Sequence, residues 1–238
     1  MLCKIAGLYV EIPAAGDMIS RCRNYLCDRT EETIGADIII CTERFRRERQ
    51  GNLSDDLFSY VETGIQFSTD CLKYGAVVLH ASAVEMDGKA YLFSAPCGTG
   101  KSTHTSLWKS VFGEKANIFN DDKPILRNME GTWYAYGAPW CGKDGININM
   151  KVPVAGICFL KQAPENKIRR LSNREAVQKI IWQTAHNYAN AERMDKRLAL
   201  IDSIVRTIPI FELENRPETE AAYLSYETMR RAAEELGL

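Results

Sequence analysis

The chain has 238 residues, which suffices for one large domain or for a core with a small appendage. Apolar residues make up 45% and charged residues 26%, as in globular proteins, and no apolar run approaches the roughly 18 residues that a membrane span requires. The formal net charge is -1, with Lys and Arg scattered along the chain. Composition therefore gives no electrostatic basis for binding nucleic acid or an anionic membrane.

The first residues lack the apolar core of a signal peptide, so we expect a cytoplasmic protein. The 8 cysteines never form a C-x-x-C pair. In a chain of this length, scattered cysteines are more typical of reduced core thiols than of a disulfide framework. Both observations favour a reducing compartment.

We interpret residues 1–75 as an α+β segment packed on a core formed by residues 76–238. β-branched residues predict strands over 4–12 and 36–41, and the patterns of 18–27 and 53–73 predict helices or mixed segments. The segment also holds a basic cluster, Arg44-Phe45-Arg46-Arg47-Glu48-Arg49. Such a cluster is typical of a solvated loop, with substrate docking as the alternative.

Residues 77–86 form an almost wholly apolar run, as in a strand buried on both faces. Asp87-Gly88 follows, the strongest two-residue signal for a hairpin turn. A tight turn here sets His80 opposite Ala95, at the mouth of the next loop. A lone histidine in an apolar strand is usually a core residue, but this register favours a functional one.

Residues 90–103 run from an apolar strand into a glycine-bearing turn and then into a predicted helix. This order is typical of a phosphate-binding loop, because glycines let backbone N–H groups converge on an anion that the helix N-terminus also attracts. The consensus G-x-x-x-x-G-K-[ST] is met except that Ala95 replaces its first glycine. The alternative is a chance match in an ordinary strand-to-helix turn. The candidate nucleotide-binding residues are Cys97, Gly98, Thr99, Gly100, Lys101, Ser102 and Thr103.

A short strand over 116–119 precedes Asn120-Asp121-Asp122. Parallel strands joined by a helix present their carboxyl ends at one sheet edge, so we expect these carboxylates beside the phosphate loop. Paired carboxylates there can hold Mg²⁺ and accept a proton from a hydroxyl. Asn-Asp-Asp-Lys-Pro is also a good turn sequence, and a simple turn is the alternative.

Residues 123–127 and 132–136 predict a second hairpin, which leads into a loop over 137–145 with three glycines and one proline. This composition predicts a mobile loop that can close Lys143 over the transferred phosphoryl group or the acceptor. A surface loop with a solvated lysine is the alternative.

The last third of the chain carries no assigned chemistry. We expect a buried strand over 154–160, helices from Ser172 to about 188 and over 192–207, an edge strand over 208–213, and a final helix over 217–238. His186 is interpreted as structural.

Three segments together carry a resemblance: residues 80–83, residues 97–102, and Asn120-Asp121-Asp122. They resemble the superfamily of HPr kinase/phosphorylase and phosphoenolpyruvate carboxykinase, with a closer similarity to small HPr-kinase-like proteins over about 79–160 and 208–217. The resemblance implies an α/β fold with a mixed α+β sheet, namely a P-loop-containing HPr kinase/phosphoenolpyruvate carboxykinase-like core, and the cofactors ATP and Mg²⁺.

The same resemblance implies a role for each matched residue. Lys101 would bind phosphates, Ser102 and Asp122 would bind Mg²⁺, Asp121 would be the base, and His80 would lie near the metal or the γ-phosphate. The chain departs from both families at Cys97, where they usually have serine, and it lacks a clear counterpart of the arginine-rich signature of HPr kinases. It is also far shorter than a carboxykinase.

The sequence thus predicts an ATP- and Mg²⁺-dependent kinase acting on a hydroxyl, either serine in a peptide or protein or small-molecule serine. Phosphoryl transfer needs mainly positioning and charge neutralisation, so a phosphate loop, a metal ligand and a base suffice. The alternatives are an inactive nucleotide-binding regulator and a peptide-modification accessory protein. The expected partners are a nucleotide and a hydroxyl acceptor, without nucleic acid or membrane, and an oligomer is compatible with the sequence.

Overall fold

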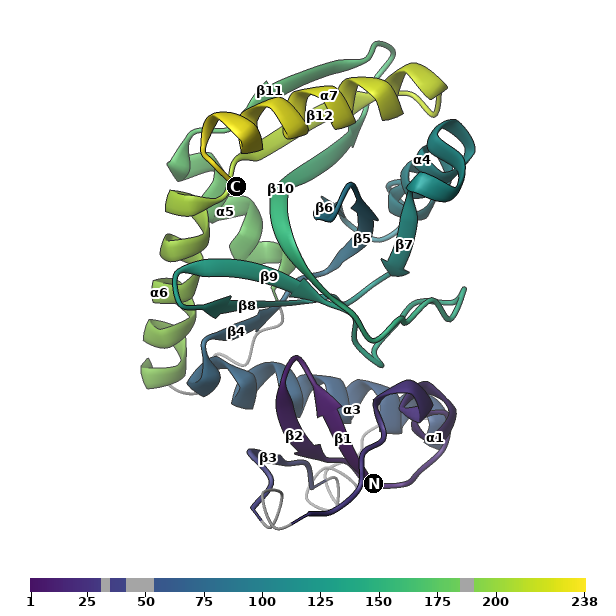
Figure 1. The fold of residues 1–238 in the computed structure, drawn as a ribbon, viewed down its shortest axis with the longest axis vertical. Coiled ribbons are helices and arrows are strands. Elements are labelled where there is room, and N and C mark those ends of the chain that lie inside the picture. The colour runs from purple at the N-terminus through teal and green to yellow at the C-terminus, as the bar shows by residue number, and fades with distance from the viewer. Residues whose placement is uncertain (31–34, 42–53, 185–190) are drawn as a thin grey trace.

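The computed structural model describes residues 1–30, 35–41, 54–184 and 191–238. Within these ranges, a nine-stranded mixed sheet forms the centre of the molecule (Figure 1). Seven strands follow the order β4-β8-β9-β10-β6-β5-β7, and β12 joins β10 to β11. The strands are β4 (Ala76–Val78), β5 (Ala81–Met86), β6 (Lys89–Ser94), β7 (Asn117–Asn120), β8 (Ile125–Met129), β9 (Thr132–Tyr136), β10 (Lys151–Gln162), β11 (Lys167–Arg170) and β12 (Ile210–Asn215). The predicted mixed α+β sheet is confirmed.

Strand β10 connects the two halves of this sheet. Its first residues pair antiparallel with β9, and its later residues pair parallel with β6 on one side and β12 on the other. The register shifts between Val154 and Gly156. Such irregularities bend a strand, which fits the curled sheet in Figure 1.

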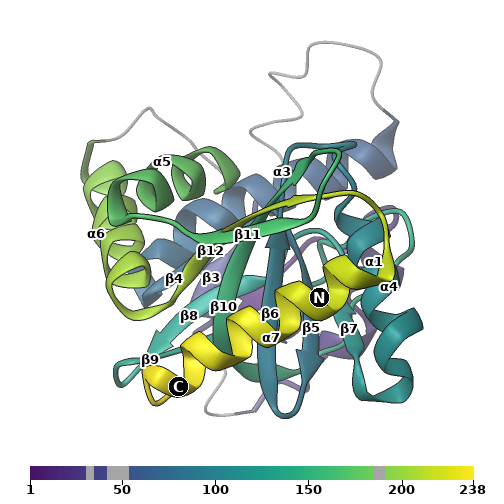
Figure 2. The same ribbon diagram turned by 90° about the horizontal axis from the view of Figure 1, so that it is seen from above.

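Helices cover both faces of the sheet. Alternate residues of β6 separate the two sides: Tyr91 and Phe93 pack toward α4 (Lys101–Phe112) and α7 (Thr219–Glu235), whereas Ala90 and Leu92 pack toward α5 (Asn173–Gln183) and α6 (Ala191–Thr207). Figure 2 shows α7 crossing the sheet on one side, with β11 and β12 running between it and the paired helices α5 and α6. No helix in these described ranges is long and apolar enough to cross a membrane.

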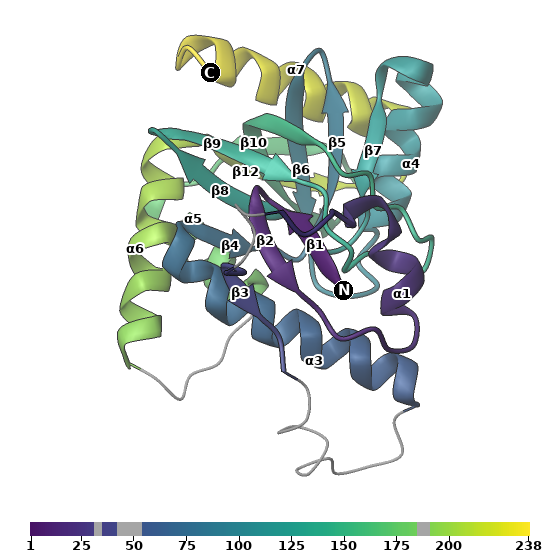
Figure 3. The same ribbon diagram turned by 60° about the horizontal axis from the view of Figure 1, so that its bottom comes forward.

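The N-terminal residues form a small sheet of β1 (Leu2–Ile5), β2 (Leu8–Glu11) and β3 (Ile38–Ile39), with the short helices α1 (Met18–Arg21) and η1 (Arg23–Tyr25). The longer α3 (Asp55–Asp70) lies against it, as Figures 1 and 3 show, and leads into η3 (Cys71–Tyr74). One hydrophobic cluster joins this segment to β4, β8 and β9. The segment is therefore packed directly on the main sheet.

Three strand predictions need correction. The strand expected over 4–12 is a hairpin, because Ala6 and Gly7 adopt positive φ. The run 77–86 is two strands that break at Leu79 and His80, since β4 pairs with β8 while β5 pairs with β6 and β7. The strand expected at the edge, β12, is internal, with β11 outside it.

Candidate functional site

The hairpin β5–β6 has the predicted register. Asp87 and Gly88 adopt φ of 54° and 72°, and Ala81 pairs with Ser94 at the open end of the hairpin. The Ser94 hydroxyl donates to the His80 carbonyl at 2.8 Å. His80 therefore lies where β5 begins and the loop after β6 starts.

The carboxyl ends of β6 and β7 lie at the same edge. Both strands pair antiparallel with β5, which lies between them, so they run parallel to each other. The Ser82 hydroxyl donates to the Asp121 carbonyl at 3.0 Å, and the Ala81 N–H donates to the Asp122 carbonyl at 3.0 Å. His80, residues 95–103 and the Asp121-Asp122 pair thus meet at one sheet edge.

The loop between β6 and α4 is shaped by its glycines. Gly98 and Gly100 adopt φ of 78° and 110°, and an added Cβ would meet nothing within 4 Å at either position. Within the described ranges, the N–H groups of both glycines form no hydrogen bond. Residues 96–98 are exposed, as are Ser102 and Thr103 in the first turn of α4, whose N–H groups have no intrahelical acceptor.

Lys101 extends along this loop. Its Nζ donates to the Ala95 carbonyl at 3.0 Å. Partial burial lowers the Lys101 pKa, an effect that the Asp122 carboxylate opposes and the Lys123 ammonium reinforces. The ammonium is thus held at the loop without a carboxylate partner among the described residues.

Asp122 is the centre of a polar cluster. Its Oδ1 lies 3.1 Å from His80 Nε2, and its Oδ2 lies 3.1 Å from Lys123 Nζ and 3.2 Å from the Tyr60 hydroxyl. Burial acts to raise its pKa, but the hydrogen bond from His80 and the charge of Lys123 together lower it to about 2. Asp122 is therefore ionised at neutral pH.

His80 links this cluster to α5. The imidazole Nδ1 lies 3.0 Å from Gln183 Oε1, and the His80 N–H donates to the Gln183 carbonyl at 2.7 Å. The ring is thus held between Gln183 and Asp122, and the backbone hydrogen bond joins this part of the chain to the end of α5.

Asp121 has a different environment. It is 7% exposed, and its Oδ1 accepts the Gly142 N–H at 2.6 Å. Burial raises its pKa, opposed by that hydrogen bond and reinforced by the charges of Asp122 and Asp144. The two neighbouring carboxyl groups are thus shifted in opposite directions.

Much of the loop over 137–145 is anchored, contrary to the expected mobile loop. Residues 137–141 are buried. The Trp140 indole stacks on Phe67 and donates a hydrogen bond to the Thr63 hydroxyl. In addition, Asn120 Nδ2 donates to the Ala138 carbonyl. Lys143 is exposed. Its closure over a substrate stays a prediction.

Sequence reasoning missed four residues that surround the predicted ones. Lys123 follows Asp122 directly and could have been found by its position. Tyr60 and Gln183 come from distant helices, and Arg21 lies 4.8 Å from the Tyr60 ring while donating to the Cys141 carbonyl. Only the folded chain brings these three to the site. The basic cluster over 44–49 and His186 lie outside the described residues.

Residues 60–216 match the family described as SynChlorMet cassette protein ScmC. The chain belongs to this family. The matched segment begins at Tyr60 and contains His80, the loop after β6 and both aspartates, so the site described above lies within the family's shared region.

No curated protein matches the chain. Among solved structures, it is similar to the HPr(Ser) kinase/phosphatase from Coxiella burnetii, with a TM-score of 0.37 and 10% identity, over 66% of this chain and 97% of that one. Values this low establish neither a common fold nor a common activity.

Proposed function

We propose that this ScmC-family chain is an ATP- and Mg²⁺-dependent kinase that transfers the γ-phosphoryl group to a hydroxyl, either serine of a peptide or protein or small-molecule serine. One observation carries the proposal: a glycine-bearing loop ending in Lys101, a histidine and two carboxylates meet at the carboxyl ends of β6 and β7. Ligands of α/β sheets bind at such edges.

The loop after β6 fits a nucleotide phosphate. Gly98 and Gly100 leave open space, and their N–H groups have no hydrogen-bond partner in the part of the chain that the structure describes. The N-terminus of α4 adds its positive dipole end. Lys101 Nζ donates a hydrogen bond to the Ala95 carbonyl. When ATP binds, Lys101 would exchange this hydrogen bond for contacts with the β- and γ-phosphates. Cys97, Thr99 and Thr103 would line the same turn. The exposed Lys143 would contact the phosphates through closure of the loop tip, residues 143–145.

The electrostatics favour different roles for the two aspartates. A base works best when its pKa lies near the working pH, so the raised pKa of Asp121 suits proton removal from the acceptor hydroxyl. Ionised Asp122 suits a cation. Its contacts with His80 and Lys123 keep it ionised and oriented, so these two side chains act on Asp122 rather than on the acceptor.

Mg²⁺ commonly binds through one or two carboxylates together with substrate phosphates. Asp122 and the Ser102 hydroxyl would hold it here, with the contact from Lys123 to Asp122 Oδ2 displaced or shared. When bound, the metal neutralises phosphate charge and orients the group to be transferred.

The proposal is tested by incubating the protein with γ-labelled ATP, Mg²⁺ and an acceptor panel of free serine, serine peptides and HPr. We expect label on one acceptor. Asp121→Asn should lower the transfer rate by about 10²- to 10⁴-fold with nearly unchanged Mg-ATP affinity, as for a lost general base. Asp122→Asn should weaken Mg²⁺-dependent nucleotide binding as well as transfer.

Glu130→Gln is the control, because Glu130 is an exposed carboxylate in the turn between β8 and β9, away from the two aspartates. It should transfer at the rate of the unmodified protein. Equal transfer rates for Asp121→Asn, Asp122→Asn and the unmodified protein would contradict the proposal. Tight Mg-ATP binding with no labelled acceptor would favour the nucleotide-binding regulator or the accessory protein.

A further inference from the structure

A mostly apolar cavity of about 150 Å³ lies between α3 and the candidate site. Helix α3 contributes Val61, Gly64 and Ile65 to its wall, β4 contributes Val78, and the anchored loop contributes Trp140. The cavity is thus formed jointly by the N-terminal segment and the main sheet.

Two further wall residues belong to the polar cluster. Tyr60 and Lys123 line the cavity and also contact Asp122 Oδ2. The cavity and the Asp122 cluster therefore share a wall, and a molecule in the cavity lies next to the contacts of the proposed Mg²⁺ ligand.

The back of the cavity is formed by the Trp140 indole, which is held on two sides. Trp140 stacks on Phe67 with ring centroids 4.6 Å apart and donates to the Thr63 hydroxyl at 3.1 Å. A Cβ added at Gly64 would lie 3.1 Å from Trp140 Cδ1, so the glycine permits this close approach despite its cost within a helix. An aromatic ring held on two sides keeps the cavity from collapsing.

The size and the surroundings of the cavity indicate its occupant. An apolar cavity of this volume holds a group about as large as a benzene ring. On α3, Leu57 (47% exposed), Val61 and Ile65 (39% exposed) follow at four-residue spacing and form an apolar surface about 12 Å long, of which about 6 Å, from Val61 to Leu57, lies past the cavity. A single side chain cannot cover that length, whereas an extended peptide can.

We propose that the cavity is a specificity pocket for a peptide acceptor and takes an aliphatic or aromatic side chain near the hydroxyl-bearing residue. That the peptide is an acceptor rests on the proposed function. The pocket itself rests on its apolar wall, its volume and its shared boundary with the Asp122 cluster.

The test uses immobilised protein and a pool of nine-residue peptides with serine at the centre and random residues elsewhere. Retained peptides are identified by mass spectrometry. We expect about tenfold enrichment of Leu, Ile, Met or Phe at one position near the serine, the ratio expected for burying one such side chain after ordering costs.

Two variants probe the pocket. Val61→Trp fills the cavity and should abolish the enrichment. Ile65→Glu places a charge at the partly exposed mouth of the cavity and should reduce the enrichment without disturbing the core. If Val61→Trp fails to fold, Ile65→Glu alone tests the pocket. Tyr223→Trp, at an exposed residue of α7, is the control and should enrich like the unmodified protein, because α7 lies at the other end of the molecule from α3 (Figure 1).

The possible outcomes distinguish failure of the pocket proposal from failure of the kinase proposal. The pocket proposal would be overturned if the unmodified protein showed no enrichment, or if both pocket variants enriched peptides as strongly as the unmodified protein. Labelling of serine peptides from γ-labelled ATP regardless of their flanking residues would overturn the pocket and leave the kinase. Enriched peptides that never acquire label would overturn the kinase and leave a peptide-binding pocket.

Discussion

The neighbouring carboxyl groups of Asp121 and Asp122 should affect stability with opposite sign. The folded-state pKa of Asp122 is lowered from 3.8 to about 2, so its ionised form stabilises the fold by about 2 kcal/mol at neutral pH. The pKa of Asp121 is raised, so its ionised form costs stability at neutral pH.

Asp122→Asn should therefore lower the free energy of unfolding at pH 7 by about 2 kcal/mol, and Asp121→Asn should raise it. The stabilisation by Asp122 is present above the unfolded-state pKa and decreases as pH falls toward about 2. Denaturant unfolding of both variants from pH 7 to pH 3 measures this. A loss of stability in Asp121→Asn equal to that in Asp122→Asn would refute the assignment.

Cys97 offers a chemical probe of the phosphate loop. It is exposed in the turn between Ala95 and Gly98, whereas Cys41 is exposed away from the site. Mg-ATP at ten times its dissociation constant should slow alkylation of Cys97 about tenfold by mass action. Peptide mapping of the alkylated cysteines provides the rates.

Cys41 is the internal control of this experiment, since its alkylation rate should not change with nucleotide. Equal slowing of both cysteines would indicate a general effect of ATP on the protein or the reagent. An unchanged rate at Cys97 would place the nucleotide elsewhere.

At the scale of elements, the end of α5 is held by a buried arginine on α6. Arg197 is 3% exposed, its Nε donates to the Thr184 hydroxyl at 2.9 Å, and its Nη2 donates to the Ile181 carbonyl. Gln183, which positions His80, lies between these two acceptors in the chain. Arg197 therefore acts as a positioning residue for the Asp122 cluster.

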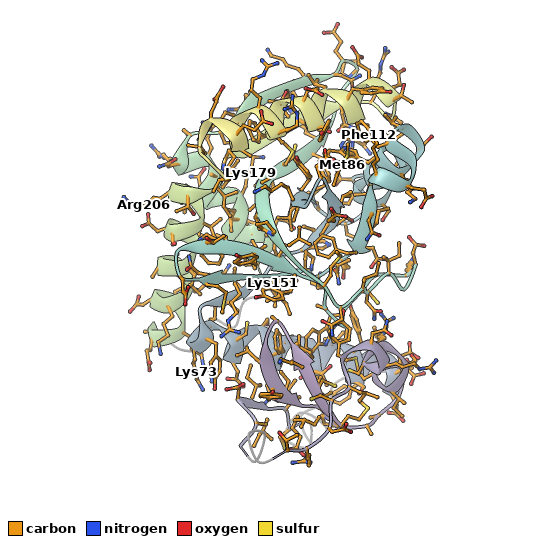
Figure 4. All side chains as sticks on the ribbon, in the orientation of Figure 1. Lys73, Met86, Phe112, Lys151, Lys179 and Arg206 are labelled. Atoms are coloured by element: carbon orange, nitrogen blue, oxygen red, sulfur yellow. The ribbon has the colours of Figure 1, made fainter. Side chains whose placement is uncertain are left out.

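Arg197→Met should lower the free energy of unfolding by about 1–3 kcal/mol, because it leaves buried acceptors unpaired. It should also lower kcat for phosphoryl transfer more than it raises KM for ATP, which a purely structural residue would not do. Arg206→Met is the control on the same helix. Arg206 is exposed and points away from the sheet (Figure 4). Among the described residues it pairs only with Asp202, four positions earlier in the helix. Identical kinetic parameters in both variants would contradict the positioning role.

Local signals explain which elements were predictable. Asp87-Gly88 determines the register that places His80 near Ala95. Ser172 and Glu175 form a capping box at the start of α5, where the sequence predicts that the helix begins. Gly98 and Gly100 mark the loop by their backbone freedom. Each of these depends on residues adjacent in the chain.

At the scale of the whole molecule, the remaining features depend on contacts between distant segments. Tyr60 reaches Asp122 from α3, which no local pattern indicates. The break at His80 arises because β4 and β5 have different partners, and the loop over 137–145 is anchored by Trp140 packing on α3. The candidate reacting groups could thus be predicted, whereas the cluster and the cavity around them could not.

The most direct test of the account is calorimetric titration of Mg-ATP into the unmodified protein and Lys101→Ala. The unmodified protein should bind, and Lys101→Ala should lose most of that affinity, since Lys101 provides the loop's ammonium for the phosphates. Lys109→Ala, an exposed lysine later in α4 that pairs with Glu114, should bind as the unmodified protein does. Equal Mg-ATP affinity in Lys101→Ala and the unmodified protein would contradict a nucleotide site at this sheet edge.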